Sequence, residues 1–202
     1  IKYPMAGNTS HQVTLGVYDI NSQKKIFLNI DGDKEQYLTA VTWSPDSKYI
    51  FVGVLNREQN HMKMNQYDAV TGNLVKTLFE ETSDKYVEPQ HPLLFFPNSN
   101  TDFIWQSQRT GYNHLFHYSL EKGLIAQITK GDWLVTDILG FNEKKKEIYY
   151  TSTQESPMER HLYRVNWNNF KTQRLSTAPG MHTGVLSKDG TQLYDIYSNA
   201  TT

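Results

Sequence analysis

The chain has 202 residues, of which 20 are Lys or Arg and 21 are Asp or Glu, so its formal net charge is −1. A hydrophobic fraction of 38% and a charged fraction of 20% are ordinary for a globular protein and unlike a disordered or membrane-embedded one. The basic residues are scattered, which argues against nucleic acid as a partner. The absence of cysteine excludes disulfides, thiolate metal sites and a thiol nucleophile.

The sequence shows neither a membrane span nor a targeting segment. No apolar run approaches the roughly 20 residues needed to cross a bilayer, so no span is expected in this segment. The chain begins at Ile1 without a basic start followed by an apolar core, so no signal peptide is visible. It starts as if it were cut from a longer protein.

The predicted strands follow one another in groups of four short segments. Residues 11–33 supply two strands, the first ending at Tyr18 and the second at 25–30. Three complete groups follow, at 38–82, 91–131 and 135–178. A further group begins at 182–202 and is incomplete.

Each group places a polar turn before its second strand. Ser-Pro-Asp-Ser-Lys at 44–48 and Ser-Lys-Asp-Gly-Thr at 187–191 are typical of tight hairpin loops. The segments at 96–100 and 141–145 follow the same plan. An apolar strand is predicted after each of the four turns, at 49–55, 102–106, 147–152 and 192–197. The turns recur at intervals of 52, 45 and 45 residues.

Internal similarity supports the same period. His-Leu-Phe at 114–116 matches His-Leu-Tyr at 161–163, 47 residues later. Four short strands repeated every 45–52 residues are typical of β-propeller blades, which bury both faces of each sheet against neighbours. The sequence therefore predicts an all-β fold, a β-propeller fragment of about four blade-equivalents of four-stranded antiparallel sheets.

The ends of the chain leave two arrangements open. Both fall within a blade, so we expect residues 1–202 to be part of one larger propeller domain, because propellers close to hide their sheet edges. Alternatively, the partial blades at 11–33 and 182–202 complete each other and close a four-bladed ring.

No catalytic or cofactor motif is present. The chain lacks the Gly-x-Ser-x-Gly elbow, the Gly-x-Gly-x-x-Gly fingerprint and the P-loop, so no catalytic residue and no cofactor are expected. None of the seven histidines forms a His-Glu-x-x-His pair. His114 and His117 would point to opposite faces of a strand, so we interpret them as ordinary hydrogen-bonding residues.

An acidic run and three repeated arginines are candidate binding sites. Asp31, Asp33 and Glu35 alternate, but they lack the later bidentate Glu of a calcium loop, so a solvated turn and no metal are expected. Three arginines occupy equivalent loops between second and third strands: Arg57, Arg109 and Arg160. They either clamp a substrate carboxylate or hold neighbouring backbone and carboxylate groups, and their repetition favours the structural role.

Six segments in order resemble the propeller of dipeptidyl peptidase IV, a serine peptidase of the prolyl oligopeptidase family, in a bacterial version. They are Tyr-Pro-Met-Ala-Gly-Asn at 3–8, Leu-Asn-Arg-Glu-Gln-Asn at 55–60, Ser-Gln-Arg-Thr-Gly-Tyr-Asn-His-Leu at 107–115, Thr-Lys-Gly-Asp-Trp at 129–133, Glu-Ser-Pro-Met-Glu-Arg-His-Leu-Tyr at 155–163 and Pro-Gly-Met-His at 179–182. Each motif alone is weak, but six in order cover nearly the whole chain. The resemblance identifies the chain as a fragment of the N-terminal propeller domain.

The resemblance implies a parent enzyme that releases N-terminal dipeptides with Pro or Ala second. Its Ser, His and Asp lie in an α/β-hydrolase domain beyond Thr202, so this chain alone is expected to be inactive. The glutamates that hold the substrate amino group and the dimerisation arm lie before Ile1. The implied partners are a peptide substrate, the catalytic domain of the same parent chain and a second copy in a homodimer. The implied location is the bacterial periplasm or cell surface.

One substrate contact is implied within the chain. Lys-Tyr-Val-Glu-Pro at 85–89 is similar to a loop between blades that borders the outer substrate subsites. Mammalian members carry Phe-Arg there, and this segment has no Arg. Tyr86 and Glu88 are therefore the candidate substrate-binding residues, with a plain solvent loop as the alternative.

Two other functions stay open at this point. A stand-alone propeller could serve as a protein-interaction scaffold, and another prolyl oligopeptidase-family member, such as an acylaminoacyl peptidase, would share the architecture. The ordered motifs favour dipeptidyl peptidase IV.

Overall fold

The computed structural model describes residues 5 and 7–200, and every regular element in that part of the chain is a β-strand. Tyr3, Pro4 and Ala6 of the first family-like motif lie outside the described residues. The strands are β1 (Gly16–Tyr18), β2 (Lys25–Phe27), β3 (Tyr37–Trp43), β4 (Tyr49–Leu55), β5 (His61–Asp68), β6 (Leu74–Thr82), β7 (Leu94–Phe95), β8 (Asp102–Ser107), β9 (His114–Ser119), β10 (Gly123–Gln127), β11 (Val135–Asn142), β12 (Glu147–Ser152), β13 (His161–Asn166), β14 (Thr172–Arg174), β15 (Met181–Leu186) and β16 (Leu193–Ser198).

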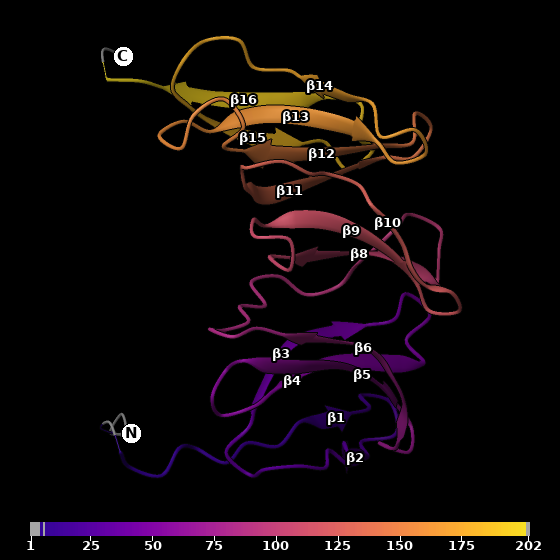
Figure 1. The fold of residues 1–202 in the computed structure, drawn as a ribbon. Coiled ribbons are helices and arrows are strands. Elements are labelled where there is room, and N and C mark those ends of the chain that lie inside the picture. The colour runs from indigo at the N-terminus through magenta and orange to yellow at the C-terminus, as the bar shows by residue number, and fades with distance from the viewer. Residues whose placement is uncertain (1–4, 6, 201–202) are drawn as a thin grey trace. The chain divides into compact units, whose positions relative to one another are not determined.

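The strands form five sheets in which neighbours in sequence are neighbours in space (Figure 1). Three sheets have four strands, in the orders β3-β4-β5-β6, β10-β9-β8-β7 and β11-β12-β13-β14. The other two are the pairs β1-β2 and β15-β16. Each of these pairs is antiparallel, as are the neighbours in the sheets β3–β6 and β11–β14. The all-β prediction is confirmed.

The chain divides into two compact units. The first comprises residues 1–95, 99–103 and 120–123, and the second comprises residues 96–98, 104–119 and 124–202. The division passes through β8 and β10. The first unit holds β1 to β7, and the second holds β9 and β11 to β16.

The predicted hairpin loops are built on serine and aspartate side chains. Ser44 Oγ donates to Asp46 Oδ1 over 2.7 Å and accepts the backbone N–H of Tyr49 over 2.9 Å. Ser187 makes the same two contacts with Asp189 and the backbone N–H of Gln192, at 2.7 and 2.9 Å. Such side-chain bonds close a turn and fix where the next strand begins. The loops at 44–48 and 187–191 are confirmed.

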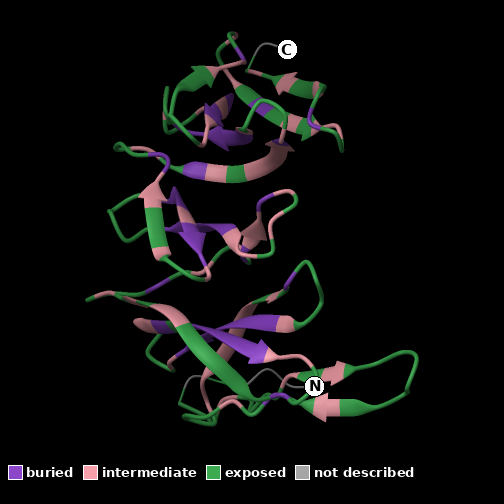
Figure 2. Ribbon diagram, turned by 90° about the vertical axis from the view of Figure 1, so that its right-hand side faces the viewer, coloured by how far each residue is buried: buried purple, intermediate pink, exposed green. Residues whose placement is uncertain are grey.

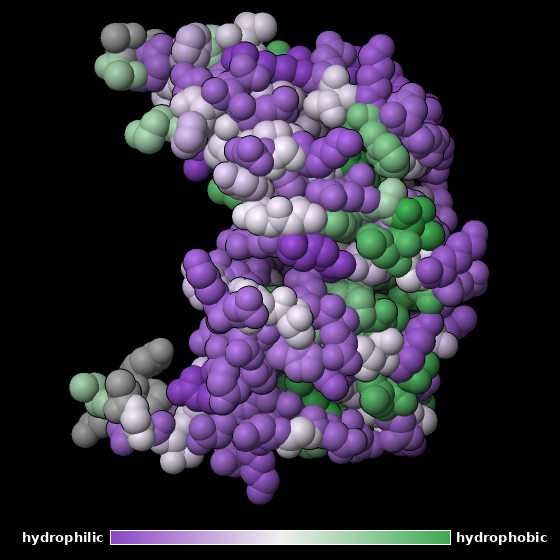
Figure 3. Space-filling view, in the orientation of Figure 1, coloured by the Kyte–Doolittle hydropathy of each residue, from purple (hydrophilic) through white to green (hydrophobic). Residues whose placement is uncertain are grey.

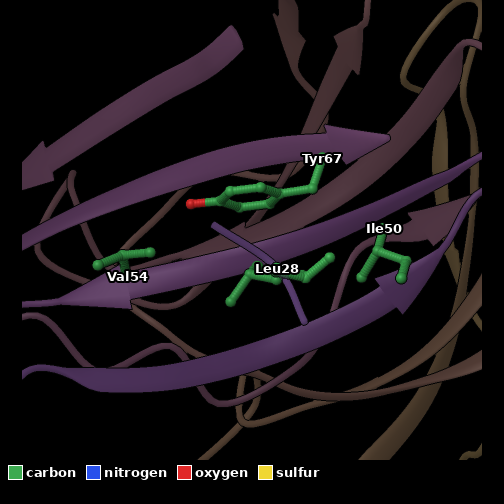
Figure 4. Packing of buried hydrophobic residues seen from close by; sticks show 5 residues of the cluster. Leu28, Ile50, Val54 and Tyr67 are labelled. Carbon is green, nitrogen blue, oxygen red and sulfur yellow. The ribbon is translucent and has the colours of Figure 1, made fainter. Parts of the chain in front are cut away.

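Burial concentrates in the central strands (Figure 2). In β4, Ile50, Val52 and Val54 pack with Leu28 and Tyr67 (Figure 4), whereas Phe51, on the opposite face, lies 5.5 Å from the ring of Phe95. A strand buried on both faces needs an unbroken apolar run rather than alternation, which is what 50–55 supplies. The outer strand β6 is largely exposed, and hydrophilic residues dominate the face in view in Figure 3.

The repeated histidines support the third strands of two sheets. Thr129 Oγ1 accepts the backbone N–H of Leu115 over 3.0 Å and lies 3.1 Å from His114 Nδ1. The same arrangement recurs at His161 and Ser176, with a ring-to-hydroxyl distance of 2.9 Å. The internal repeat at 114–116 and 161–163 therefore reflects a shared hydrogen-bonding unit, and these histidines are ordinary structural residues, as predicted for His114.

Strand β3 contains an irregularity that the sequence did not predict. Its pairing with β4 shifts between Thr39 and Thr42, and Ala40 in this interval has a φ of 50°. A non-glycine residue with positive φ is uncommon and raises the local free energy. The shift is a β-bulge, which bends the strand and changes the direction of the side chains that follow.

Candidate functional site

The candidate substrate segment is fixed to the loop before β5. After β6 ends, the backbone N–H of Ser83 donates to the carbonyl of Asn60 over 3.0 Å, and that of Val87 donates to the carbonyl of Gln59 over 2.7 Å. Val87 is buried, with 8% of its surface exposed. Two backbone bonds and one buried side chain therefore hold this segment in place.

Tyr86 and Glu88 flank the buried Val87 and both are exposed. Tyr86 retains 58% of its accessible surface. Glu88 is also exposed, whereas Pro89 is half-buried. Among residues 5 and 7–200, no hydrogen bond or ion pair engages either side chain, so both are free to contact a molecule in solution.

The loop that receives this segment is itself stabilised by one asparagine. Asn56 Oδ1 accepts the backbone N–H groups of Asn60 and His61, each over 2.9 Å, and its Nδ2 donates to Asn60 Oδ1 over 2.7 Å. Gln59 in this loop has a φ of 58°, and its carbonyl oxygen accepts the backbone N–H of Val87. The Leu-Asn-Arg-Glu-Gln-Asn motif thus builds the support for residues 83–88.

The three repeated arginines make contacts of a structural kind. Arg57 donates to the hydroxyl of Tyr37, and its guanidinium lies 5.6 Å from that ring and 3.8 Å from Glu35. Arg109 and Arg160 lie in the second unit. Arg109 donates to Ser107 Oγ over 3.0 Å and lies 4.9 Å from the ring of Phe116.

Arg160 is engaged by its own loop. Its Nη1 donates to the carbonyls of Pro157 and Glu159, over 3.0 and 2.8 Å. A guanidinium that already bonds to nearby backbone or carboxylate oxygens is satisfied without a ligand. The contacts of all three arginines support the structural interpretation over a carboxylate clamp.

The acidic run forms a turn. Asp33 Oδ1 accepts the backbone N–H of Glu35 over 2.8 Å, and Glu35 Oε1 accepts that of Ser10 over 3.2 Å. Within residues 5 and 7–200, no group of three or more His, Asp or Glu residues is arranged to hold a metal ion. The carboxylates of Asp33 and Glu35 thus accept backbone N–H groups.

Comparison with known proteins identifies the family. The model of the dipeptidyl peptidase IV (DPP IV) N-terminal region matches residues 1–202. The chain belongs to this family. Among curated relatives, the dipeptidyl-aminopeptidase B of Aspergillus niger is 31% identical over 200 residues, which cover 90% of this chain and 22% of that protein.

Two solved structures share the fold of the DPP IV N-terminal region. A Bacteroides ovatus protein assigned as a dipeptidyl aminopeptidase IV is 40% identical, with a TM-score of 0.87, over 96% of this chain and 30% of that one. Porphyromonas gingivalis dipeptidyl peptidase 4 is 25% identical, with a TM-score of 0.89, over 100% of this chain and 28% of that one. The prediction of a β-propeller fragment of the DPP IV family is confirmed.

The chain spans less than a third of the length of these relatives. The curated relative from Aspergillus niger is fungal and the two solved structures are bacterial, so the source expected from the resemblance stays a prediction. In the described part of the DPP IV-like chain, no helix is long and apolar enough to cross a membrane.

The family resemblance singles out Tyr86 and Glu88, but it gives no sign of the contacts that support them. The alternation of Tyr86, Val87 and Glu88 is a period-two signal for a buried residue between two exposed ones. The bond from Val87 to Gln59 joins residues 28 positions apart, which no local pattern encodes. The segment is therefore better anchored than a plain solvent loop.

Proposed function

We propose that this chain is the non-catalytic propeller portion of a DPP IV-like serine exopeptidase, which removes N-terminal dipeptides with Pro or Ala second. The observation that carries the proposal is the family match over all of residues 1–202. The relatives are dipeptidyl peptidases by name and three to five times longer than the matched region, which leaves room for a separate catalytic domain.

In this proposal the propeller gates and positions the peptide. The serine, activated by a histidine that an aspartate orients, belongs to an α/β-hydrolase domain of the same parent chain. Tyr86 and Glu88 contact the peptide substrate in its outer subsites. Contacts that hold the peptide beyond the scissile bond lower the cost of aligning it with the nucleophile. In this proposal the chain helps to bind the peptide substrate but supplies no group that reacts with it.

The proposal includes the organisation of the parent protein. Residues 1–202 are part of one propeller domain, with partial blades at 11–33 and 182–202 around the complete blades at 38–82, 91–131 and 135–178. The parent is a homodimer in the bacterial periplasm or at the cell surface. No cofactor is required, because serine-based acyl transfer uses only protein groups.

Hydrolysis of Gly-Pro-p-nitroanilide tests the proposal. The full-length protein should release p-nitroaniline, and a covalent serine-hydrolase inhibitor should abolish the reaction. The 202-residue chain at the same concentration should show no turnover. Inhibitor-sensitive turnover by this chain alone would overturn the assignment, and a full-length protein without activity would favour a scaffold.

A further inference from the structure

Two adjoining cavities lie in the first unit, beside the connection between β2 and β3. Their volumes are about 350 and 380 Å³, and they share Gly32, Asp33 and Gln36 as lining residues. Small-molecule sites usually measure about 300–1,000 Å³, so the larger cavity reaches the size of a ligand site by itself. Its far wall is formed by β5 and β6.

A buried chain of hydrogen bonds ends at this larger cavity. Thr77 Oγ1 donates to Asn65 Oδ1 over 2.7 Å, and Asn65 Nδ2 donates to the hydroxyl oxygen of Tyr67 over 3.1 Å. The direction of each bond is fixed, because the amide oxygen only accepts and the amide nitrogen only donates. The Tyr67 oxygen therefore accepts, and its own proton is left to donate further.

The Tyr67 hydroxyl proton has no acceptor among the contacts of residues 5 and 7–200. The side chain is 1% exposed, and it lines the larger cavity. Figure 4 shows its hydroxyl directed toward the end of β4 that carries Val54, another lining residue. Burial raises the pKa of Tyr67 above its usual value, so the hydroxyl stays protonated and able to donate.

The walls of the cavity carry charges of both signs. Asp31 lines it and acts electrostatically on Tyr67, and no hydrogen bond engages its carboxylate within the described residues. Lys63 and His61 line it as well, and both contact Glu80, at 3.6 and 2.6 Å. Lys63 and His61 are thus already paired with Glu80, whereas Asp31 offers an acceptor for an ammonium group and Tyr67 an unused donor for a carboxylate beside the same space.

We propose that this cavity binds a small zwitterion with a primary ammonium group and a carboxylate, namely a free amino acid or short peptide. The ammonium group pairs with Asp31, and the carboxylate accepts from the Tyr67 hydroxyl. Val54 and Leu74 supply an apolar wall for an aliphatic side chain. The site does not rest on the proposed peptidase function, because neither Tyr86 nor Glu88 is among its lining residues.

Titration calorimetry with L-leucine tests the charge requirement. L-leucine and the dipeptide Leu-Gly are both titrated into the full-length protein. At least one of them should bind, with micromolar to millimolar affinity. N-acetyl-L-leucine lacks the ammonium group and L-leucinamide lacks the carboxylate, so each should bind at least tenfold more weakly. Equal binding of these derivatives, or no detectable binding of either zwitterion up to about 10 mM, would overturn the proposal.

Matched variants place the binding in this cavity. Tyr67→Phe removes only the hydroxyl and should weaken leucine binding about fivefold, the usual effect of one hydrogen bond. Tyr49→Phe, in β4 but not among the lining residues, should leave it unchanged. Asp31 is exposed, so the Asp31→Asn variant should fold normally. It should also weaken leucine binding, because it removes the charge that pairs with the ammonium group. Unchanged affinity in both Tyr67→Phe and Asp31→Asn would refute the site, whether or not the parent is a peptidase.

Discussion

The backbone N–H of Val87 donates a 2.7 Å hydrogen bond to the carbonyl oxygen of Gln59. This bond ties the segment after β6 to the loop before β5, and the buried side chain of Val87 reinforces it. Tyr86 and Glu88 are thereby presented on a supported backbone. Side chains held this way lose less entropy on binding than those of a loose loop.

Replacing Tyr86 or Glu88 should weaken the binding of longer substrates but not of short ones. In the full-length protein, Tyr86→Ala or Glu88→Gln should raise KM for a hexapeptide with Pro second by about threefold to tenfold, since each removes about one contact. The rate with Gly-Pro-p-nitroanilide should not change, because that substrate is too short for the outer subsites. Tyr18→Ala is the control, because Tyr18 is 58% exposed, like Tyr86. An equal effect of Tyr86→Ala and Tyr18→Ala would count against a substrate contact.

Glycine at position 72 is required for close packing of the β1–β2 pair. Gly72 has a φ of 75°, its carbonyl accepts the backbone N–H of Asn29 over 2.8 Å, and a β-carbon there would collide with the Phe27 carbonyl. Gly123 has a φ of 73° and open space around it. Gly123→Ala should cost about 1–2 kcal/mol of stability for the strained φ alone. Gly72→Ala should cost about 1–3 kcal/mol more.

Thermal unfolding of the two glycine variants measures this difference. Both glycines have a similar positive φ, so the difference in stability between the two variants reports the contact with the Phe27 carbonyl. Identical unfolding midpoints for Gly72→Ala and Gly123→Ala would contradict the close approach of Gly72 to the Phe27 carbonyl.

The bulge in β3 predicts a stabilising substitution. Ala40 has a φ of 50°, which glycine adopts without the steric cost of a β-carbon, so Ala40→Gly should stabilise the protein by about 0.5–1 kcal/mol. Ala126 is a half-buried alanine of β10 and is not among the residues with positive φ. Ala126→Gly should therefore destabilise by about 0.5–1 kcal/mol. Urea unfolding of both variants checks the opposite signs, and a loss of stability in both would contradict the bulge.

A fall in pH should lower the free energy of unfolding through protonation of His114. Its Nδ1 lies against the Thr129 hydroxyl and its Nε2 lies 2.9 Å from the Gly131 carbonyl, and burial lowers its pKa below the ordinary 6.5. Below pH 6.5 the unfolded chain then binds more protons than the folded one, so the free energy of unfolding falls as pH decreases. The stabilisation is present above pH 6.5 and is lost as pH falls toward the folded pKa.

The pH effect is measured as a difference between variants. His114→Gln should reduce the slope of unfolding free energy against pH between about pH 5 and 7, relative to the wild type. His11→Gln is the control, because His11 is exposed. If His11→Gln flattens the slope as much as His114→Gln does, the buried imidazole is not responsible.

The regular parts of the fold could be predicted from sequence because their signals are local. The strands at 49–55 and 147–152 have the predicted limits, since a polar turn precedes each and an apolar run fills it. The strand predicted at 25–30 is shorter in the structure, where it spans Lys25–Phe27. The backbone of Leu28 still bonds to Leu15, but that of Asn29 turns to Gly72, a partner distant in sequence.

The remaining features depend on contacts between distant residues. The positive φ of Ala40 follows from a bulge rather than from its residue type, because alanine has no preference for that region. The buried bond between Asn65 and Tyr67 could be suspected from two polar residues on one face of a strand. The cavity beside them could not, because its other wall is the connection at 31–36.

The sequence of the gene beyond Thr202 tests the central claim most directly. If this chain is the propeller portion of a DPP IV-like peptidase, the reading frame should continue into an α/β-hydrolase domain with a Gly-x-Ser-x-Gly elbow, followed by Asp and His in that order. A stop codon shortly after Thr202 would contradict the account and indicate a self-contained propeller.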